Sequence, residues 1–416
     1  MRKMKDSGVA WIGEIPEEWT VRRLKNFASI QNGMDYRKVF DEGGEFPVIG
    51  SGGAFAHASQ FMYDKTSVLL GRKGTVDKPI FIDCPFWTVD TMYYTVIHED
   101  VSPRYFYYLC TQIPFTYFSY GSAVPSMTQR DLNSVHFPYP PKTEQEAMAT
   151  YLDECCESLQ ETIDEAQNLV DKLTAYKQSL ITEAVTKGLH PEVARKDSGD
   201  PLVGEIPASW KFISLKYLLA SGRDSMRVGP FGSQLKGQDF QEEGVPVFTQ
   251  KTVLDNDFFH GDTFISQEKY EQLKSFAVEA GDILITTRGS IGKIAVAPPD
   301  VTCGILHPCV IRFRTDKSKV MDEFLKYVFN ETDLLRQQLL LKSNATTIDV
   351  VYSYALKCVS LAVPPLEEQR EIVSYLANKC AAIDADIARR RKLIERLSAY
   401  RRSLIYEVVT GKREVV

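Results

Sequence analysis

The sequence lacks any long apolar segment. No run comes near the roughly 18 apolar residues that a membrane-spanning helix requires. The opening stretch MRKMKDSGVAWIGEIPEEW carries acidic side chains and has no apolar core. We therefore expect neither a membrane span nor a secretory signal. The 8 cysteines include no C-x-x-C pair, which favours reduced thiols over a disulfide framework. Together these absences predict a soluble, cytoplasmic protein.

The sequence also lacks the motifs of common DNA-modifying and nucleotide-hydrolysing enzymes. It has no P-loop, no Asn/Asp-Pro-Pro-aromatic string of the kind an adenine methyltransferase uses, no F-x-G-x-G cofactor loop, no serine elbow and no H-E-x-x-H. Cys303, His307 and Cys309 are close in sequence, but they fall in an apolar strand-like run with no second ligand pair nearby. We expect no catalytic residue, no bound cofactor and no metal in this chain.

The sequence does contain a long heptad helix, and it contains it twice. The first copy runs from about Thr143 to Lys187 and the second from about Glu367 to the C-terminus. Mainly apolar residues recur at alternating steps of three and four over four heptads, which predicts a coiled coil. The first copy has Leu152, Leu159, Ala166, Leu173 and Leu180 on one row and Cys156, Ile163, Val170 and Lys177 on the other; the second has Leu376, Ile383, Arg390, Leu397 and Leu404, with Cys380, Ile387, Ile394 and Arg401.

The two helices match at one offset of 224 residues, with no gap. They open on PPKTEQ and PPLEEQ, and later contain LTAYKQSLI and LSAYRRSLI. Residues 143–190 hold 3 Lys/Arg against 10 Asp/Glu, whereas residues 367–416 hold 11 against 8. An acidic helix and its basic duplicate can pair within one chain. The alternative is that both charged faces are simply solvated, which would give the same numbers of charged residues. We expect the part of the first helix beyond Leu180 to lie at its solvent end, outside the central layers.

The duplication extends to the globular segments. WIGEIPEEW, ending at Trp19, returns as LVGEIPASW, ending at Trp210. Each repeat is thus a tryptophan-tipped lead-in, a globular segment, a Pro-Pro turn and a helix. Joining the two chain ends would rebuild a linker like the one at Gly188–Trp210, which predicts a pseudo-twofold arrangement with neighbouring termini. Strand-like runs alternate with turns: FPVIG, SVLLG, PIFI and MYYTVI in the first segment, VPVFTQ, DILITT, KIAVA and CVIRFR in the second, with helices expected at Pro103–Gln112 and Met321–Leu341.

One turn is repeated in the two segments. VLLGRKGTVDKPIFI corresponds to ILITTRGSIGKIAVA, so Lys73-Gly74-Thr75 aligns with Arg288-Gly289-Ser290 and Lys78 with Lys293. A strand that leads into a cation, a glycine and a hydroxyl offers backbone N–H groups and positive charge to a phosphate. An ordinary hairpin turn is the alternative. We predict DNA contacts here, at Arg72, Lys73, Gly74, Thr75 and Lys78 in the first segment and at Arg288, Gly289, Ser290 and Lys293 in the second.

A polar loop closes each globular segment. The loops are YGSAVPSMTQRDL and LKSNATTIDV. Their Gln129, Arg130, Asn344, Thr346 and Thr347 carry donors and acceptors suited to base edges in a major groove. Each of these residues could equally belong to a capped helix start.

Two diverged globular segments, each followed by a PPxxEQ-led heptad helix, resemble the specificity subunit of type I restriction–modification systems. GEFPVIGSGG and VGPFGSQLKGQDF also resemble openings of that family's target recognition domains, which adds Ser233, Gln234 and Lys236 as candidate DNA contacts. The resemblance implies a mixed α/β fold, with two mainly-β target recognition domains separated by two long antiparallel coiled-coil helices. The expected divisions are 1–142, 143–190, 191–366 and 367–416.

The resemblance also implies a function. Each recognition domain would read one half of a bipartite, asymmetric site in double-stranded DNA. The paired helices would act as a spacer and dock two methyltransferase subunits, with restriction subunits joining them. S-adenosylmethionine would sit on the methyltransferase, which flips the target adenine. Two alternatives remain at this point: a coiled-coil scaffold without DNA readout, and a self-contained DNA-modifying enzyme.

Overall fold

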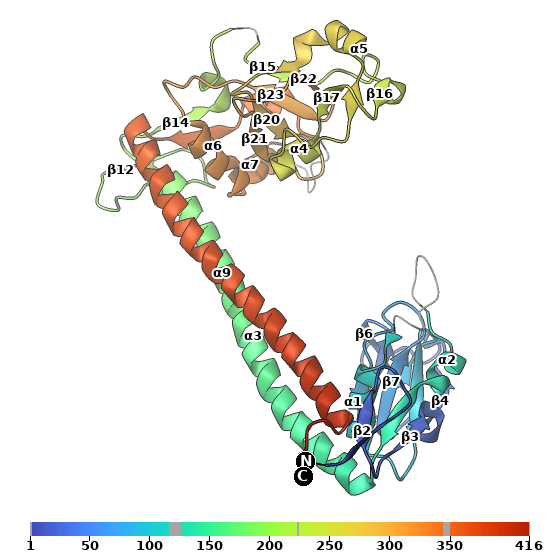
Figure 1. The fold of residues 1–416 in the computed structure, drawn as a ribbon. Helices are drawn as coiled ribbons and strands as arrows, with labels where there is room; N and C mark the ends of the chain where they lie inside the picture. Colours follow the sequence, from blue (N-terminus) through green and yellow to red (C-terminus); the bar gives the residue numbers. More distant parts are fainter. Residues whose placement is uncertain (1, 116–125, 223, 344–349, 416) are drawn as a thin grey trace. The chain divides into compact units, whose positions relative to one another are not determined.

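A computed structural model of the chain describes residues 2–115, 126–222, 224–343 and 350–415. The chain divides into two compact units, one made of Met1–Asn168 with Arg390–Val416 and the other of Leu169–Arg389. Both long helices contribute to both units, because α3 spans Lys142–Lys187 and α9 spans Leu366–Val409. In each unit the beginning of one helix packs beside the end of the other (Figure 1). The two helices are therefore antiparallel, as predicted.

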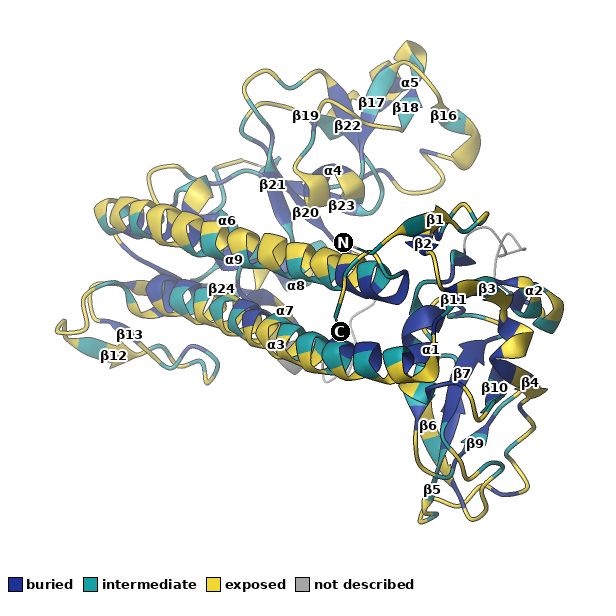
Figure 2. Cartoon of the chain, turned by 60° about the horizontal axis from the view of Figure 1, so that its bottom comes forward, coloured by how far each residue is buried: buried dark blue, intermediate teal, exposed yellow. Residues whose placement is uncertain are grey.

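The residues of the predicted heptad rows are all buried or half-buried, and the cores at the two ends of the helices include further residues beside these rows. In the first unit, Ala149 and Leu152 of α3 share a core with Leu404, Ile405 and Val408 of α9. In the second unit, the core joins Ile181, Ala184 and Val185 of α3 to Ile372, Leu376 and Cys380 of α9. Exposed residues line the outer faces of both helices (Figure 2). Burial of apolar residues along one stripe is what keeps helices of this length paired in water.

The expectation for the helix beyond Leu180 was wrong. Ile181 and Val185 are each 1% exposed, and they pack into the core of the second unit. One face of the end of α3 is therefore buried, in a core that also contains Trp210 of the second lead-in.

The first unit is built on antiparallel strands. One sheet has the order β4-β10-β7-β8, a second has β6-β5-β9, and β1-β2 and β3-β11 form two-stranded pairs. Within the second sheet β5 and β9 are parallel. The elements before α3 are β1 Met4–Asp6, β2 Glu14–Pro16, β3 Thr20–Arg23, β4 Ala28–Asn32, β5 Phe46–Gly50, β6 Gly53–Ala58, β7 Ser67–Gly71, β8 Ile80–Ile82, β9 Trp87–Thr88, β10 Met92–Ile97, α1 Pro103–Thr111, α2 Gln129–Ser134 and β11 His136–Tyr139.

The second unit repeats this topology with a larger second sheet. The order β15-β23-β20-β21 matches that of the first four-stranded sheet, and the second sheet has five strands, β16-β18-β17-β22-β19. The elements are β12 Arg195–Asp197, β13 Glu205–Pro207, β14 Lys211–Ser214, β15 Met226–Val228, β16 Phe240–Gln241, β17 Val245–Phe248, α4 Gln250–Asp255, β18 Phe264–Ile265, α5 Gln267–Gln272, β19 Ala277–Val278, β20 Ile283–Thr286, β21 Ile294–Val296, β22 Gly304–Leu306, β23 Val310–Phe313, α6 Asp322–Asn330, α7 Leu334–Ser343, α8 Ser353–Lys357 and β24 Ser360–Val363.

These bounds confirm the strand runs and the first short helix that the sequence predicts. The helix expected at Met321–Leu341 is instead two helices, α6 and α7. The hydroxyl of Thr332 donates to the carbonyl of Val328 and accepts from the backbone N–H of Leu334. A threonine hydroxyl that bonds neighbouring backbone groups in this way competes with the backbone hydrogen bonds of the helix, which accounts for the break.

The glutamine of each PPxxEQ motif fastens its helix start to the sheet domain. Gln145 is fully buried, accepts from the N–H of Ser102 at 2.9 Å and donates to the carbonyl of Pro140 at 3.0 Å. Gln369 is also fully buried, accepts from the N–H of Met321 at 2.8 Å and donates to the carbonyl of Pro364 at 2.9 Å. The repeated glutamine thus satisfies the same buried backbone groups in both units.

Candidate nucleic-acid interface

The repeated turn lies at the same place in both units. It joins β7 to β8 in the first and β20 to β21 in the second. Lys73 forms an isolated antiparallel bridge with Ser126, and Arg288 forms one with Val350. One residue further along, the N–H of Met127 donates to the carbonyl of Arg72 at 3.0 Å, and the N–H of Val351 donates to that of Thr287 at 2.9 Å. The structure therefore places each turn directly beside the segment that returns toward its long helix.

The two returning segments, Ser126–Ser134 and Val350–Lys357, will be called the return segments. Each continues through a short helix, α2 or α8, into a strand that pairs with the lead-in, β11 with β3 or β24 with β14. The backbone N–H of Leu24 donates to the carbonyl of Val135, and that of Leu215 donates to the carbonyl of Val359, both at 2.8 Å. Turn, return segment and lead-in thus form one backbone frame that occurs in both units.

Glycine is needed in both turns because of the backbone conformation. Gly74 has φ +83° and Gly289 has φ +58°, in the left-handed region that favours glycine. A Cβ on Gly74 would also lie 3.1 Å from the Oγ of Ser51. The conformation exposes Lys73 in one unit, and Arg288 and Ser290 in the other, to solvent. Both turns therefore present a cation at the surface, where a phosphate or a base edge could approach.

The other predicted residues of the turns differ in their surroundings. Arg72 is half-buried and donates to the carbonyl of Asp90 at 3.3 Å, and Thr75 is half-buried. Lys78 is exposed. The ammonium of Lys293, by contrast, donates to the carbonyl of Asn330 at the end of α6. The sequence aligns Lys78 with Lys293, but Lys293 is engaged within its own unit.

The first return segment holds Gln129 and Arg130 at the start of α2. Thr128 caps this helix, with Asp131 in a reciprocal capping box. Gln129 donates to the side-chain oxygen of Asn32 at 3.1 Å, while Arg130 is exposed. The helix start that the sequence left open as an alternative is therefore present, and it projects Arg130 into solvent.

Ser233, Gln234 and Lys236 lie in an exposed turn between β15 and β16. The side chain of Gln234 accepts from the N–H of Phe231 at 3.1 Å, and the N–H of Lys236 donates to Asp239 at 2.7 Å. The segment starts at Gly229, whose Cβ position is 2.1 Å from the carbonyl oxygen of His307, so only glycine fits there. Burial lowers the pKa of His307, and the nearby charge of Arg288 lowers it further. Asn344, Thr346 and Thr347 lie outside the described residues.

Sequence reasoning missed two exposed residues of the second return segment. Tyr352 and Tyr354 are 58% and 70% exposed. They stand at the positions that Thr128 and Arg130 occupy in the first unit, at the same offset of 224 residues as the helices. Extending that offset through the loop would have found them.

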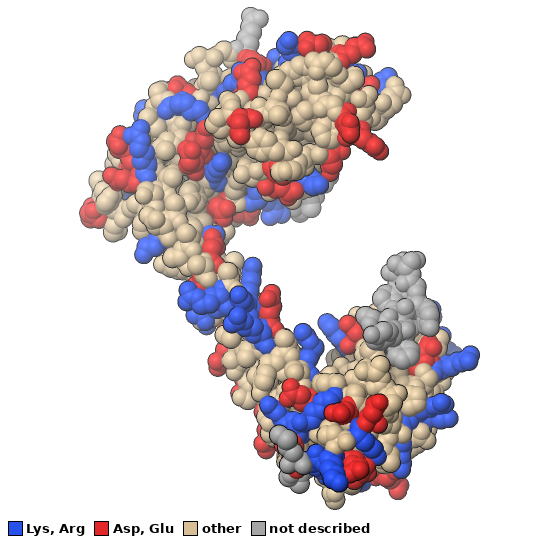
Figure 3. Space-filling view, in the orientation of Figure 1, with Lys and Arg blue, Asp and Glu red and all other residues tan. Residues whose placement is uncertain are grey.

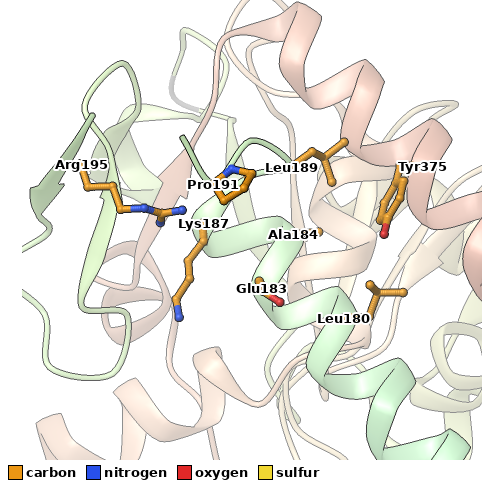
Figure 4. Close-up of a pocket in the computed structure, with 9 residues that line it drawn as sticks. Leu180, Glu183, Ala184, Lys187, Leu189, Pro191, Arg195 and Tyr375 are labelled. Atoms are coloured by element: carbon orange, nitrogen blue, oxygen red, sulfur yellow. The ribbon is translucent and has the colours of Figure 1, made fainter. Parts of the chain in front are cut away.

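A cavity of about 280 Å³ lies at the end of α3 in the second unit (Figure 4). Leu180, Glu183, Lys187 and Arg195 line it together with Tyr375 of α9. In the first unit the residue matching Tyr375 is Tyr151, and Arg413 hydrogen-bonds Tyr400 and Tyr151, which raises the pKa of its guanidinium. The matching tyrosines therefore have different surroundings: Tyr375 lines the cavity, whereas Tyr151 is bonded by Arg413.

Charge on the helices is mostly directed to solvent. Lys and Arg side chains gather along part of the helical pair (Figure 3), and α9 contains the consecutive run Arg389–Lys392. An ion pair between Lys177 and Asp384, at 2.7 Å, joins the helices, with the cation supplied by the acidic helix. The seam therefore depends on apolar packing more than on the opposite net charges.

Within the parts of the chain that the structure describes, no three His, Cys, Asp or Glu side chains are grouped to hold a metal ion. The Nδ1 of His307 accepts the N–H of Cys309 at 3.1 Å. No helix among the described residues is long and apolar enough to cross a bilayer.

Comparison with known proteins identifies the family. Residues 16–168 and 232–396 match the family model described as the type I restriction modification DNA specificity domain. The match covers well over half of the chain. The chain therefore belongs to the specificity subunits of type I restriction–modification systems, which carry DNA recognition domains.

Individual relatives are similar along much of their length. The type I restriction enzyme MjaVIII specificity subunit of Methanocaldococcus jannaschii is 22% identical over 420 residues, covering 96% of this chain and 94% of that protein. The EcoBI specificity subunit of Escherichia coli is 23% identical over 294 residues, 70% of this chain and 60% of that protein. One solved structure concerns complex assembly and conformational transition of the type I R-M system. A chain in it matches this chain with a TM-score of 0.68 at 16% identity, covering 96% of this chain and 99% of that chain. The two chains therefore share the fold.

Proposed function

We propose that this chain reads a bipartite, asymmetric site in double-stranded DNA, with one half-site for each unit. The observation that carries the proposal is the shared backbone frame with different side chains on it. Lys73 and Arg130 occupy the turn and the return segment of the first unit, and Arg288 and Tyr354 occupy the matching positions in the second. A repeated frame that presents different groups would select different bases at its two copies.

We also propose that the chain supplies the DNA address and no chemistry. Two methyltransferase subunits would dock on it, restriction subunits would join that core, and S-adenosylmethionine would bind to the methyltransferase. The exposed outer faces of α3 and α9 leave area for such partners. The net charge of −6 limits nonspecific attraction to phosphate, so tight DNA binding would draw on contacts from the methyltransferase as well.

The test is methylome sequencing of a host that expresses this chain with its methyltransferase subunits. We expect methylated adenines within one split, non-palindromic sequence, and none when this chain is omitted. Methylation that does not depend on the chain would indicate a scaffold without DNA readout. Methyl transfer by the purified chain alone would indicate a self-contained enzyme.

A further inference from the structure

Tyr352 and Tyr354 form an exposed aromatic pair on the second return segment. Their ring centroids are 5.8 Å apart and the ring planes differ by 14°, so the two rings stack on one another. Tyr352 immediately precedes α8, and both residues follow the Val350–Arg288 bridge closely. The pair is therefore held near the turn that carries Arg288.

Two exposed stacked rings are costly unless they meet a partner. A tyrosine buries roughly 150–250 Å² when covered, so these rings leave a considerable apolar area in water. The core of the unit does not need them, because Val351 and Leu356 of the same segment are the buried residues. Large apolar groups that are kept exposed on an ordered segment indicate a binding surface.

The first unit shows that the backbone does not require aromatic residues here. The N–H of Val135 donates to the carbonyl of Leu132 at 3.1 Å, and the N–H of Val359 donates to the carbonyl of Leu356 at 3.2 Å. The frame is thus the same around both return segments, yet the first presents Thr128 and Arg130 where the second presents Tyr352 and Tyr354. The difference lies in what the two surfaces offer to a ligand.

We infer that Tyr352 and Tyr354 recognise thymine in the half-site of the second unit by apolar contact with its 5-methyl group. The inference rests on the proposed function. Among the base edges of the major groove, the thymine methyl is the apolar group, whereas guanine, adenine and cytosine offer hydrogen-bonding atoms. The first unit has no aromatic side chain at the matching positions, because Thr128 caps α2 there and Arg130 presents a charge to solvent.

The experiment uses the chain in complex with its methyltransferase subunits and the duplex identified from the methylome. Each thymine of the second half-site is replaced by deoxyuridine, which removes the methyl group and keeps the pairing edge. Covering one methyl group stabilises binding by an amount that corresponds to roughly a fourfold change in affinity. We expect the wild-type complex to bind the deoxyuridine duplex about fourfold more weakly for each methyl that is contacted.

Variants assign that loss to the two tyrosines. Tyr352→Ala and Tyr354→Ala should bind thymine and deoxyuridine duplexes equally, whereas Tyr352→Phe and Tyr354→Phe should still distinguish them. Arg130→Ala, at the position that matches Tyr354, is the control and should leave the discrimination in the second half-site intact. Co-purification with the methyltransferase subunits reports that each variant is folded and assembled.

Three results would overturn the inference. The alanine variants could still discriminate thymine from deoxyuridine, they could weaken both duplexes alike as sugar or phosphate contacts would, or the second half-site could contain no thymine. Each of these leaves DNA recognition by the chain in place. Failure of the wild-type complex to bind any split site would instead count against the proposed function.

Discussion

The indole nitrogen of Trp210 donates a hydrogen bond to the carboxylate of Glu368 at 2.8 Å. The same bond joins Trp19 to Glu144 in the first unit, at 3.2 Å. Both tryptophans are buried, and both glutamates belong to a PPxxEQ motif at a helix start. The two most recognisable repeats of the sequence, which lie more than a hundred residues apart, are therefore in direct contact in each unit.

This contact predicts a pH dependence in the first unit. Arg2 donates to both carboxylate oxygens of Glu144, at 2.7 and 2.9 Å, and this lowers the pKa of Glu144, with Trp19 lowering it further. A carboxylate with a lowered pKa in the folded state stabilises the fold above its unfolded pKa, about 4.3, and this stabilisation is lost as the pH falls through the folded value. In urea unfolding, the deficit of Glu144→Gln relative to wild type should shrink between neutral pH and about pH 3. A deficit that is constant over this range would contradict the prediction. Glu154→Gln, at an exposed position of the same helix, is the control.

The buried glutamines should matter more than their exposed counterparts. Gln145→Ala removes the partner of two backbone groups and Gln369→Ala that of three, which should cost about 1–3 kcal/mol of unfolding free energy. Exposed Gln267, replaced by alanine, should stay within about 0.5 kcal/mol. Urea denaturation measures all three, and equal losses would mean that the glutamines do not fasten the helix starts.

The two basic residues of the second turn, Arg288 and Lys293, should have different roles. Arg288→Ala should relax the second half-site alone, with a loss of about 1–3 kcal/mol in binding if it contacts a base. Lys293→Ala should lower thermal stability without altering the sequence that is methylated, because its ammonium bonds the end of α6. Lys73→Ala should affect the first half-site. A relaxed second half-site in the Lys293 variant would show that this lysine reaches DNA.

The long helices offer a test of spacing. Four residues inserted after Asn168 and four after Arg389 lengthen both helices by roughly 6 Å while leaving the residues of each unit together. We expect unchanged half-sites and a longer nonspecific gap, by one or two base pairs of about 3.4 Å. Insertion in α3 alone, after Leu180, should unfold the second core, since Ile181 and Val185 are buried there. An unaltered gap with full methylation would mean that the helices do not set it.

The two ends of the chain lie in one unit (Figure 1) and pack on the same lead-in. Lys412 and Tyr406 both donate to the carbonyl of Ile12. The negative charge of Glu414 contributes to raising the pKa of Arg2. A circular permutant with a short linker between the ends, opened before Val193, should therefore fold and assemble with its partners. A permutant opened within β13, which breaks a strand pair, is the control. Loss of folding in the first variant would contradict the expectation that the ends are neighbours.

Local pattern predicted much of the fold. The heptads marked the seam because burial on a helix follows a fixed period, and the apolar runs marked β5, β7, β10 and β20 because alternation and turn residues are local properties. The offset of 224 residues then predicted the duplication of the helix, and a polar loop was expected before each copy. These features need no knowledge of distant contacts.

The features that local pattern did not predict depend on contacts across the chain. The amine of Lys293 is engaged by Asn330, 37 residues away, and no pattern around Lys293 shows this. The part of α3 beyond Leu180 was expected to lie in solvent. It is instead in one core with Trp210 of the second lead-in, which follows after a linker and is not visible in the local pattern. Tyr352 and Tyr354 lie at a predictable position. They were missed because the predicted DNA contacts were charged, amide, small hydroxyl or glycine residues, and aromatic side chains were not considered.

The antiparallel seam means that each unit is assembled from both halves of the polypeptide. A chain severed before Val193 gives two fragments, each with one complete long helix and one lead-in, and each unit still needs both fragments to complete its apolar core. Such a pair should behave as a split protein that reconstitutes when the fragments are co-expressed. It would co-migrate as one species under native conditions, and the break would be visible only on a denaturing gel.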